Sequence, residues 1–130
     1  MTAALAVLVG IAILAAATDG QGANATFTLS GSLTLIDSGV ERLAPGCVGT
    51  GGYDDMVRGA SVTVYDPSGT VIATGQVHQT EMLDSVMCRL DFEVTDVPDG
   101  HAFYQIELSH RGKVTFPVDV AKRRVALSLG

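Results

Sequence analysis

Apolar and polar residues alternate along most of this chain after residue 25, and the alternation predicts β-strands. The clearest unit is the segment 59–77, where Val62 and Val64 alternate with polar neighbours, and the alternation resumes at Val71 after a turn. A period of two residues is typical of a strand with one buried face. The intervening Asp66-Pro67-Ser68-Gly69 favours a type I turn closed by a bulge at the glycine. We therefore predict a β-hairpin whose core-facing residues are Val62, Val64, Val71 and Ala73.

Further segments alternate in the same way. One begins at Thr26, and Gly31 in its middle predicts a bulge or a bend between two sheets. Another begins at Met87 and places Cys88 on its apolar face, and shorter ones follow toward the C-terminus. The residues predicted to face the core are Phe27, Leu29, Leu33, Leu35, Cys88, Leu90, Phe92, Val94, Tyr104, Ile106, Leu108, Val114, Phe116, Val118, Val125, Leu127 and Leu129.

Two segments lack the alternation and are predicted to be connections. Residues 36–48 contain two glycines and a proline, and we expect a loop there with at most a short strand. Residues 78–86 are expected to form a polar connection between the hairpin and the strand that follows. Because turns recur at short spacing and no amphipathic helix is evident, the chain predicts an all-β fold, a Greek-key β-sandwich of about seven strands over residues 26–130.

The N-terminus has a different character. Residues 3–17 consist only of Ala, Leu, Val, Ile and Gly, and a helix of that length spans about 22 Å, less than the roughly 30 Å of a hydrocarbon core. Ala15-Ala16-Ala17 supplies the small residues that signal peptidase requires, and residues 18–25 are small and polar. We therefore predict a helical signal peptide over residues 1–17, a flexible N-terminus over 18–25, and export to the cell envelope or the medium. Because no Lys or Arg precedes the apolar run, retention of residues 1–17 as a membrane anchor stays the alternative.

The charge of the chain narrows the class of partner. A formal net charge of −6 disfavours nucleic acid and anionic membrane surfaces, both of which attract basic patches. The only basic run is Lys122-Arg123-Arg124, which we interpret as a strand edge or a solvated face. The expected partner is therefore a protein or another component of the envelope, with membrane contact only through residues 1–17 if they are not cleaved.

The two cysteines, Cys47 and Cys88, predict one disulfide bond, because an even count is typical of exported domains. By the chain-entropy estimate such a bond contributes roughly 4 kcal/mol. His78, His101 and His110 show no metal-ligand spacing, so we expect neither a metal nor another cofactor.

Four motifs in the segment 59–118 carry a family resemblance: Ala60–Asp66, Val71–Gly75, Val97–Gly100 and Tyr104–Leu108. With them the segment resembles the transthyretin-like and carboxypeptidase-regulatory-like sandwiches. This resemblance implies a transthyretin-like or Ig-like fold and does not imply a function. A wider frame consists of Cys47, Gly51–Asp55, Cys88 and Ser109–Gly112. This frame is similar to that of a group of small secreted or lipid-anchored actinobacterial envelope proteins of unknown function.

No motif indicates an enzyme. Ser109 and His110 are adjacent, so on a strand their side chains point to opposite faces. The glycine-rich run 47–55 lacks the Lys and the following helix of a phosphate loop. The favoured hypothesis is a non-enzymatic secreted or envelope binding or accessory domain; the alternative is a structural subunit of a larger envelope or membrane-associated assembly, and an envelope hydrolase is the weaker alternative.

Two loops are the candidate recognition site, because they depart from alternation and carry aromatic and charged side chains. The alternative interpretation, that both are solvated turns, stays open. The candidate residues are Tyr53, Asp54 and Asp55 in the first loop and Asp99, His101 and Phe103 in the second.

Overall fold

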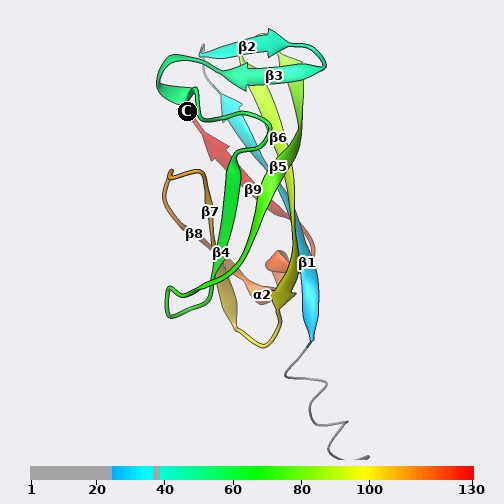
Figure 1. Cartoon of the computed structure of the whole chain (residues 1–130), viewed down its shortest axis with the longest axis vertical. Coiled ribbons are helices and arrows are strands. Elements are labelled where there is room, and N and C mark those ends of the chain that lie inside the picture. Colours follow the sequence, from blue (N-terminus) through cyan, green and yellow to red (C-terminus); the bar gives the residue numbers. More distant parts are fainter. Residues whose placement is uncertain (1–24, 37–38) are drawn as a thin grey trace, which may run out of the picture.

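Seven strands form the main sheet in the computed structural model, which describes residues 25–36 and 39–130 (Figure 1). The sheet curls until it is nearly closed into a barrel-like sandwich, with strand order β8-β7-β4-β5-β6-β1-β9. After the β4–β5–β6 hairpins, β7 returns to lie beside β4, which is the Greek-key arrangement. The predicted all-β Greek-key sandwich is therefore confirmed. Its strands are β1 (Thr26–Ile36), β4 (Ser61–Tyr65), β5 (Val71–Asp84), β6 (Met87–Pro98), β7 (Phe103–Leu108), β8 (Val114–Pro117) and β9 (Val125–Leu129).

A second, two-stranded sheet lies across one end of the sandwich (Figure 1). It consists of β2 (Val40–Leu43) and β3 (Gly46–Gly49), followed by the 3-10 helix η1 (Gly51–Tyr53). The expectation of a loop with at most a short strand over residues 36–48 was only partly right, because the segment contains β2 and most of β3. The hairpin lacks an alternating pattern because β2 is mostly exposed, and it is held in place by contacts of β3 with the main sheet.

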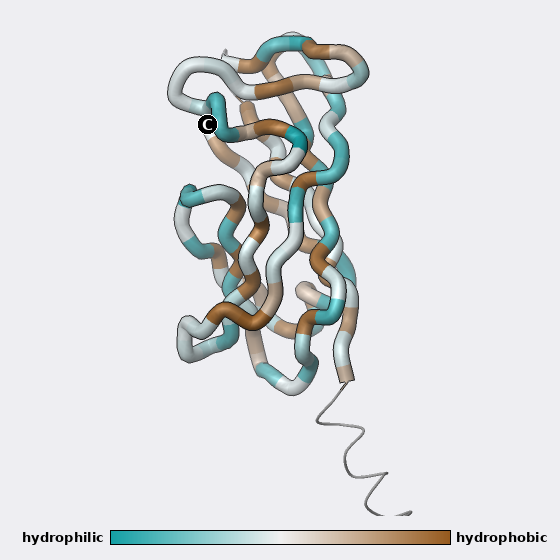
Figure 2. The backbone as a smooth tube through the Cα atoms, in the orientation of Figure 1, coloured by the Kyte–Doolittle hydropathy of each residue, from teal (hydrophilic) through white to brown (hydrophobic). Residues whose placement is uncertain are grey.

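The core lies inside the curled sheet, and the apolar face of each predicted strand supplies it. Leu29, Val64, Phe92 and Ile106 are each at most 1% exposed. Figure 2 shows the resulting alternation of hydropathy along the strands.

The predicted β4–β5 hairpin is present with its turn as expected. The Asp66 carboxylate accepts the backbone N–H groups of Ser68 and Thr70 at 2.9 and 3.0 Å, and Gly69 has a φ of 87°. The bulge, however, changes which residues face inward. It pairs Val64 with Ala73 but Tyr65 with Val71, so Val71 shares the outer face of Tyr65 and is 53% exposed. The prediction that Val71 faces the core was wrong for this reason.

The polar connection expected over residues 78–86 was also wrong, because β5 continues through it to Asp84. Beyond Gln76, the main-sheet neighbour of β5 is β6 alone, with bulges after Val77 and Met82. One face of this extension is open to solvent, so its polar sequence is compatible with a strand.

Gly31 has a different role from the expected bulge or bend. The bulge of β1 lies between Phe27 and Leu29, and Gly31 pairs in regular register with both Phe92 and Val125. A Cβ on Gly31 would lie 2.8 Å from the Phe92 ring and would overlap the Val125 side chain. The glycine therefore allows the side chains of Phe92 in β6 and Val125 in β9 to pack closely against β1.

The C-terminal region departs from the predicted pattern at two places. Pro117 ends β8, and residues from Val118 form the short helix α2 (Val118–Ala121), so Val118 is not on a strand and Lys122-Arg123-Arg124 follows a helix. Val114 pairs with buried Ile106 but is 42% exposed, because β8 is the last strand on that side of the sheet.

Candidate functional site

The β2–β3 hairpin is fixed to the main sheet by two contacts and to the buried segment before β4 by a third. The predicted disulfide between Cys47 and Cys88 joins β3 to β6. The Cys47 N–H donates to the Thr80 hydroxyl at 2.9 Å, and the Gly49 N–H donates to the Met56 carbonyl at 2.9 Å. Met56 is fully buried, so this end of the hairpin rests on the core. Gly46 lies so close to Thr80 that a Cβ would overlap it, which leaves no room for a larger residue.

A groove of about 590 Å³ runs along the junction of the hairpin with β5. Its volume lies within the range of small-ligand sites, about 300–1,000 Å³. One part of its wall is the apolar turn of the hairpin, and another is formed by the turn that precedes β4. The lining residues are Leu43, Ala44, Pro45, Gly46, Cys47, Val48, Arg58, His78, Gln79, Thr80 and Glu81.

Arg58 is the cation of this groove. The tight turn that carries it is fastened to β5, because the Gly59 N–H donates to the Val77 carbonyl at 2.8 Å and the Val77 N–H donates to the Ala60 carbonyl at 2.9 Å. His78 follows Val77 directly, so the Arg58 and His78 side chains border the groove from adjoining segments. Within the described residues, the Arg58 guanidinium has neither an ion pair nor a hydrogen bond.

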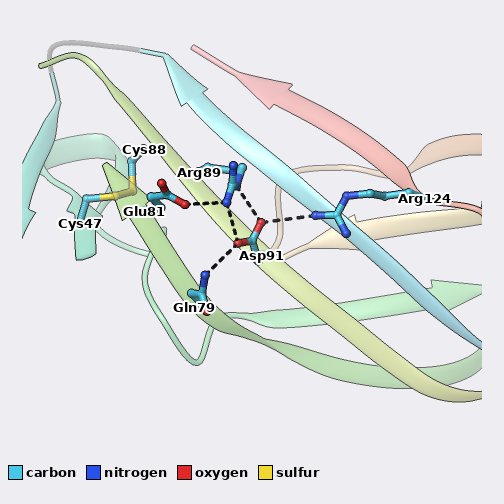
Figure 3. A network of polar contacts seen from close by, with 7 residues as sticks. All are labelled: Cys47, Gln79, Glu81, Cys88, Arg89, Asp91 and Arg124. Atoms are coloured by element: carbon cyan, nitrogen blue, oxygen red, sulfur yellow. Dashed lines mark hydrogen bonds and ion pairs between the residues drawn. A yellow bond between two sulfur atoms is a disulfide. The ribbon is translucent and has the colours of Figure 1, made fainter. Parts of the chain in front are cut away.

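A polar network covers the outer face of β6 beside the hairpin (Figure 3). Asp91 is only 8% exposed although alternation places it on the outer face. Its carboxylate accepts from the Arg89 Nε at 2.9 Å and lies 3.5 Å from both the Gln79 amide and the Arg124 guanidinium. Arg89 also pairs with Glu81 at 2.7 Å, and the neighbouring Asp91 carboxylate raises the pKa of Arg89. Sequence reasoning missed this cluster, since only the β5–β6 register brings residues 79 and 81 beside 89 and 91.

The first candidate loop is tied to the β7–β8 turn. Arg111 donates to both carboxylate oxygens of Asp55 and to the Gly52 carbonyl, and its guanidinium lies 5.2 Å from the centre of the Tyr53 ring. The Arg111 hydrogen bond, opposed in part by desolvation, lowers the pKa of Asp55 to about 2. Asp54 is exposed. Of the three candidate residues, Asp55 is therefore engaged within the protein, and Asp54 is directed to solvent.

The second candidate loop lies at the opposite end of the sandwich, between β6 and β7 (Figure 1). Asp99 accepts from Lys122 at 2.6 Å, and this bond lowers the pKa of Asp99. The His101 ring meets the Tyr104 ring edge to face at 5.6 Å, and Phe103 pairs with Pro117 at the start of β7. The two candidate loops thus lie at opposite ends of the sandwich and do not share one surface.

The residues considered for catalysis lie in the β7–β8 turn. Ser109 has a positive φ of 56° and helps to lower the pKa of Asp55 through its side chain, while His110 is exposed. Within residues 25–36 and 39–130, no group of three or more His, Cys, Asp or Glu side chains is placed to hold a metal ion.

The predicted signal peptide, residues 1–17, lies outside the described residues, as does the flexible N-terminus up to residue 24. In the part of the chain that the structure describes, no helix combines the length and apolar character needed to cross a membrane.

No family model, no curated protein and no solved structure matches this chain. The resemblance to transthyretin-like domains and to actinobacterial envelope proteins therefore stays a prediction. A functional conclusion must rest on the geometry of the hairpin end.

Proposed function

We propose that this protein is a non-enzymatic binding or accessory domain, secreted or held in the cell envelope, and that its hairpin end recognises the partner. The observation that carries the proposal is the groove between the disulfide-anchored hairpin and β5. A disulfide is typical of oxidising compartments, which supports a location outside the cytoplasm. A rigid sandwich that holds a shaped surface at one end is the usual design of a binding module.

The direction of β1 supports the choice of this end. β1 starts at the end of the sandwich remote from the hairpin and runs from there toward the hairpin (Figure 1). The groove therefore lies at the end of the sandwich away from the start of β1.

A structural subunit of a larger assembly is the second candidate, and exposed apolar side chains favour it. Ile36, Leu43, Leu83 and Val86 are 46%, 60%, 41% and 41% exposed. Leu43 is on the hairpin, and the end of β1 and the β5–β6 turn, which carry the other three, lie at the same end of the sandwich (Figure 1). Exposed apolar side chains at one end are typical of a surface covered by another protein.

Crosslinking in the producing cells, followed by affinity purification and mass spectrometry, tests the proposal. We expect Leu43→Ser to reduce the yield of the crosslinked partner severalfold. Val71→Ser is the matched control, because Val71 is 53% exposed but lies at the other end of the sandwich. An unchanged yield of every partner with Leu43→Ser would refute recognition by the hairpin end.

The same purification separates the two candidate functions and the alternative loop. A complex that persists without crosslinking at fixed stoichiometry indicates a structural subunit, whereas a monomer that captures its partner reversibly indicates a binding module. Asp54→Ser tests the η1 loop without disturbing the Asp55–Arg111 pair.

A further inference from the structure

We propose that the groove between the β2–β3 hairpin and β5 binds the C-terminal carboxylate of an apolar peptide. This inference rests on the proposed function, since it names the ligand class of the same surface. Three features of the groove support it: a cation without an acidic partner, polar groups along the floor, and an apolar wall.

The carboxylate would bind to Arg58. The chain carries a net charge of −6, yet this guanidinium has no acidic partner within the described residues. Guanidinium groups bind carboxylates through two parallel hydrogen bonds, a geometry that suits the carboxylate of a peptide C-terminus. The backbone bonds of Gly59 and Val77 hold the turn of Arg58 in place, so little ordering of the backbone is required on binding.

The floor of the groove offers hydrogen bonds for the peptide backbone. His78, which lines the groove as Arg58 does, supplies a ring N–H. The Thr80 hydroxyl accepts the Cys47 N–H and keeps its own proton to donate. The Glu81 carboxylate, which also lines the groove, is held by Arg89 at 2.7 Å.

The apolar wall would contact the side chains of the peptide. It is formed by Leu43, Ala44, Pro45 and Val48, and Leu43 is 60% exposed. A cation, a polar floor and an apolar wall within about 590 Å³ match the carboxylate, amides and side chains of a short C-terminal segment.

The test is an NMR titration of the purified, nitrogen-15-labelled full-length protein with the peptide acetyl-Ala-Leu-Ala-Leu, either as the free acid or as the C-terminal amide. We expect chemical-shift changes confined to residues 43–48, 58 and 78–81. The amide should bind at least tenfold more weakly, because one charge-assisted hydrogen-bond pair is lost. Arg58→Gln should lower the affinity for the free-acid peptide at least tenfold. Arg42→Gln should leave that affinity within about twofold, since Arg42 is exposed on the β2–β3 hairpin and does not line the groove.

Several outcomes would overturn the inference: no saturable shift with the free acid up to about 5 mM, equal affinity of acid and amide, or equal losses in the two arginine variants. Binding of octanoate without binding of the peptide would identify the groove as a site for apolar acids of another kind and would also overturn it. The titration measures peptide binding at the groove itself. Failure of the proposed function appears separately, as unchanged partner yields in the crosslinking experiment.

Discussion

Arg111 binds both carboxylate oxygens of Asp55 and thereby joins the β7–β8 turn to the segment that follows η1. These residues are far apart in sequence, and the side chains are 28% and 34% exposed. The same guanidinium also contacts the Gly52 carbonyl and the Tyr53 ring. The pair therefore holds the glycine-rich loop against the sandwich.

We expect Asp55→Asn to lower the free energy of unfolding at pH 7 and to lose this effect in acid. The folded state lowers the pKa of Asp55 from 3.8 to about 2, so the stabilisation is present above the unfolded pKa and is lost as the pH falls through about 2. The full shift corresponds to roughly 2 kcal/mol, and solvent screening of this partly exposed pair reduces our expectation to about 1 kcal/mol. Urea unfolding at pH 7 and near pH 2 measures the difference. A difference between wild type and variant that is equal at both pH values would contradict the assignment.

The Asp91 network predicts a graded series of arginine variants. Arg89→Gln should lower the free energy of unfolding by about 1–3 kcal/mol, because it removes the shortest hydrogen bonds to the nearly buried Asp91 carboxylate. Arg124→Gln should cost at most about 1 kcal/mol, since its 3.5 Å contact is made by a side chain that is 56% exposed. Arg123→Gln is the control, because both members of its 3.7 Å pair with Asp119 are 69% exposed. Thermal unfolding ranks the variants, and an Arg124 effect as large as that of Arg89 would show that this account of the network is wrong.

Gly31→Ala should destabilise the protein by about 1–3 kcal/mol, because the added methyl group overlaps Val125 and lies 2.8 Å from the Phe92 ring. Gly52→Ala is the matched control, since a Cβ there meets no atom within 4 Å. Denaturant midpoints of the two variants provide the measurement. Equal midpoints would mean that β9 does not pack against Gly31 as closely as described.

Removal of the disulfide should be the most costly of these changes. The bond joins residues that are 41 positions apart, and the chain-entropy estimate for such a loop is about 4 kcal/mol. We expect the Cys47→Ala/Cys88→Ala double variant to unfold at a much lower urea concentration than the oxidised protein. The wild type under reducing conditions is the control and should shift by a similar amount. A double variant as stable as the oxidised wild type would show that the Thr80 and Met56 contacts are sufficient to hold the hairpin.

The local pattern of the sequence was sufficient to predict the fold class and much of the core. Alternation in β1, β6 and β7 depends only on which face of a strand is buried, so it is visible without knowledge of the partner strand. The Asp66–Gly69 turn was predictable for the same reason, because its hydrogen bonds join residues within the turn. The two cysteines likewise sufficed for the disulfide, since a chain with one pair allows a single connection.

The tertiary structure alone decided the composition of the site. The β2–β3 hairpin has little alternation because β2 is mostly exposed, and contacts to β5 and β6, remote in sequence, hold the hairpin in place. The burial of Asp91 depends on the register of β5 with β6, and the pairing of Asp55 with Arg111 depends on two loops, distant in sequence, that meet in the fold. A sequence pattern encodes neither. The groove arises where the hairpin crosses the extension of β5, so Arg58 and His78 become neighbours of Leu43 only after the sheet has curled. Local periodicity reports burial, whereas a surface built from several segments depends on how those segments pack.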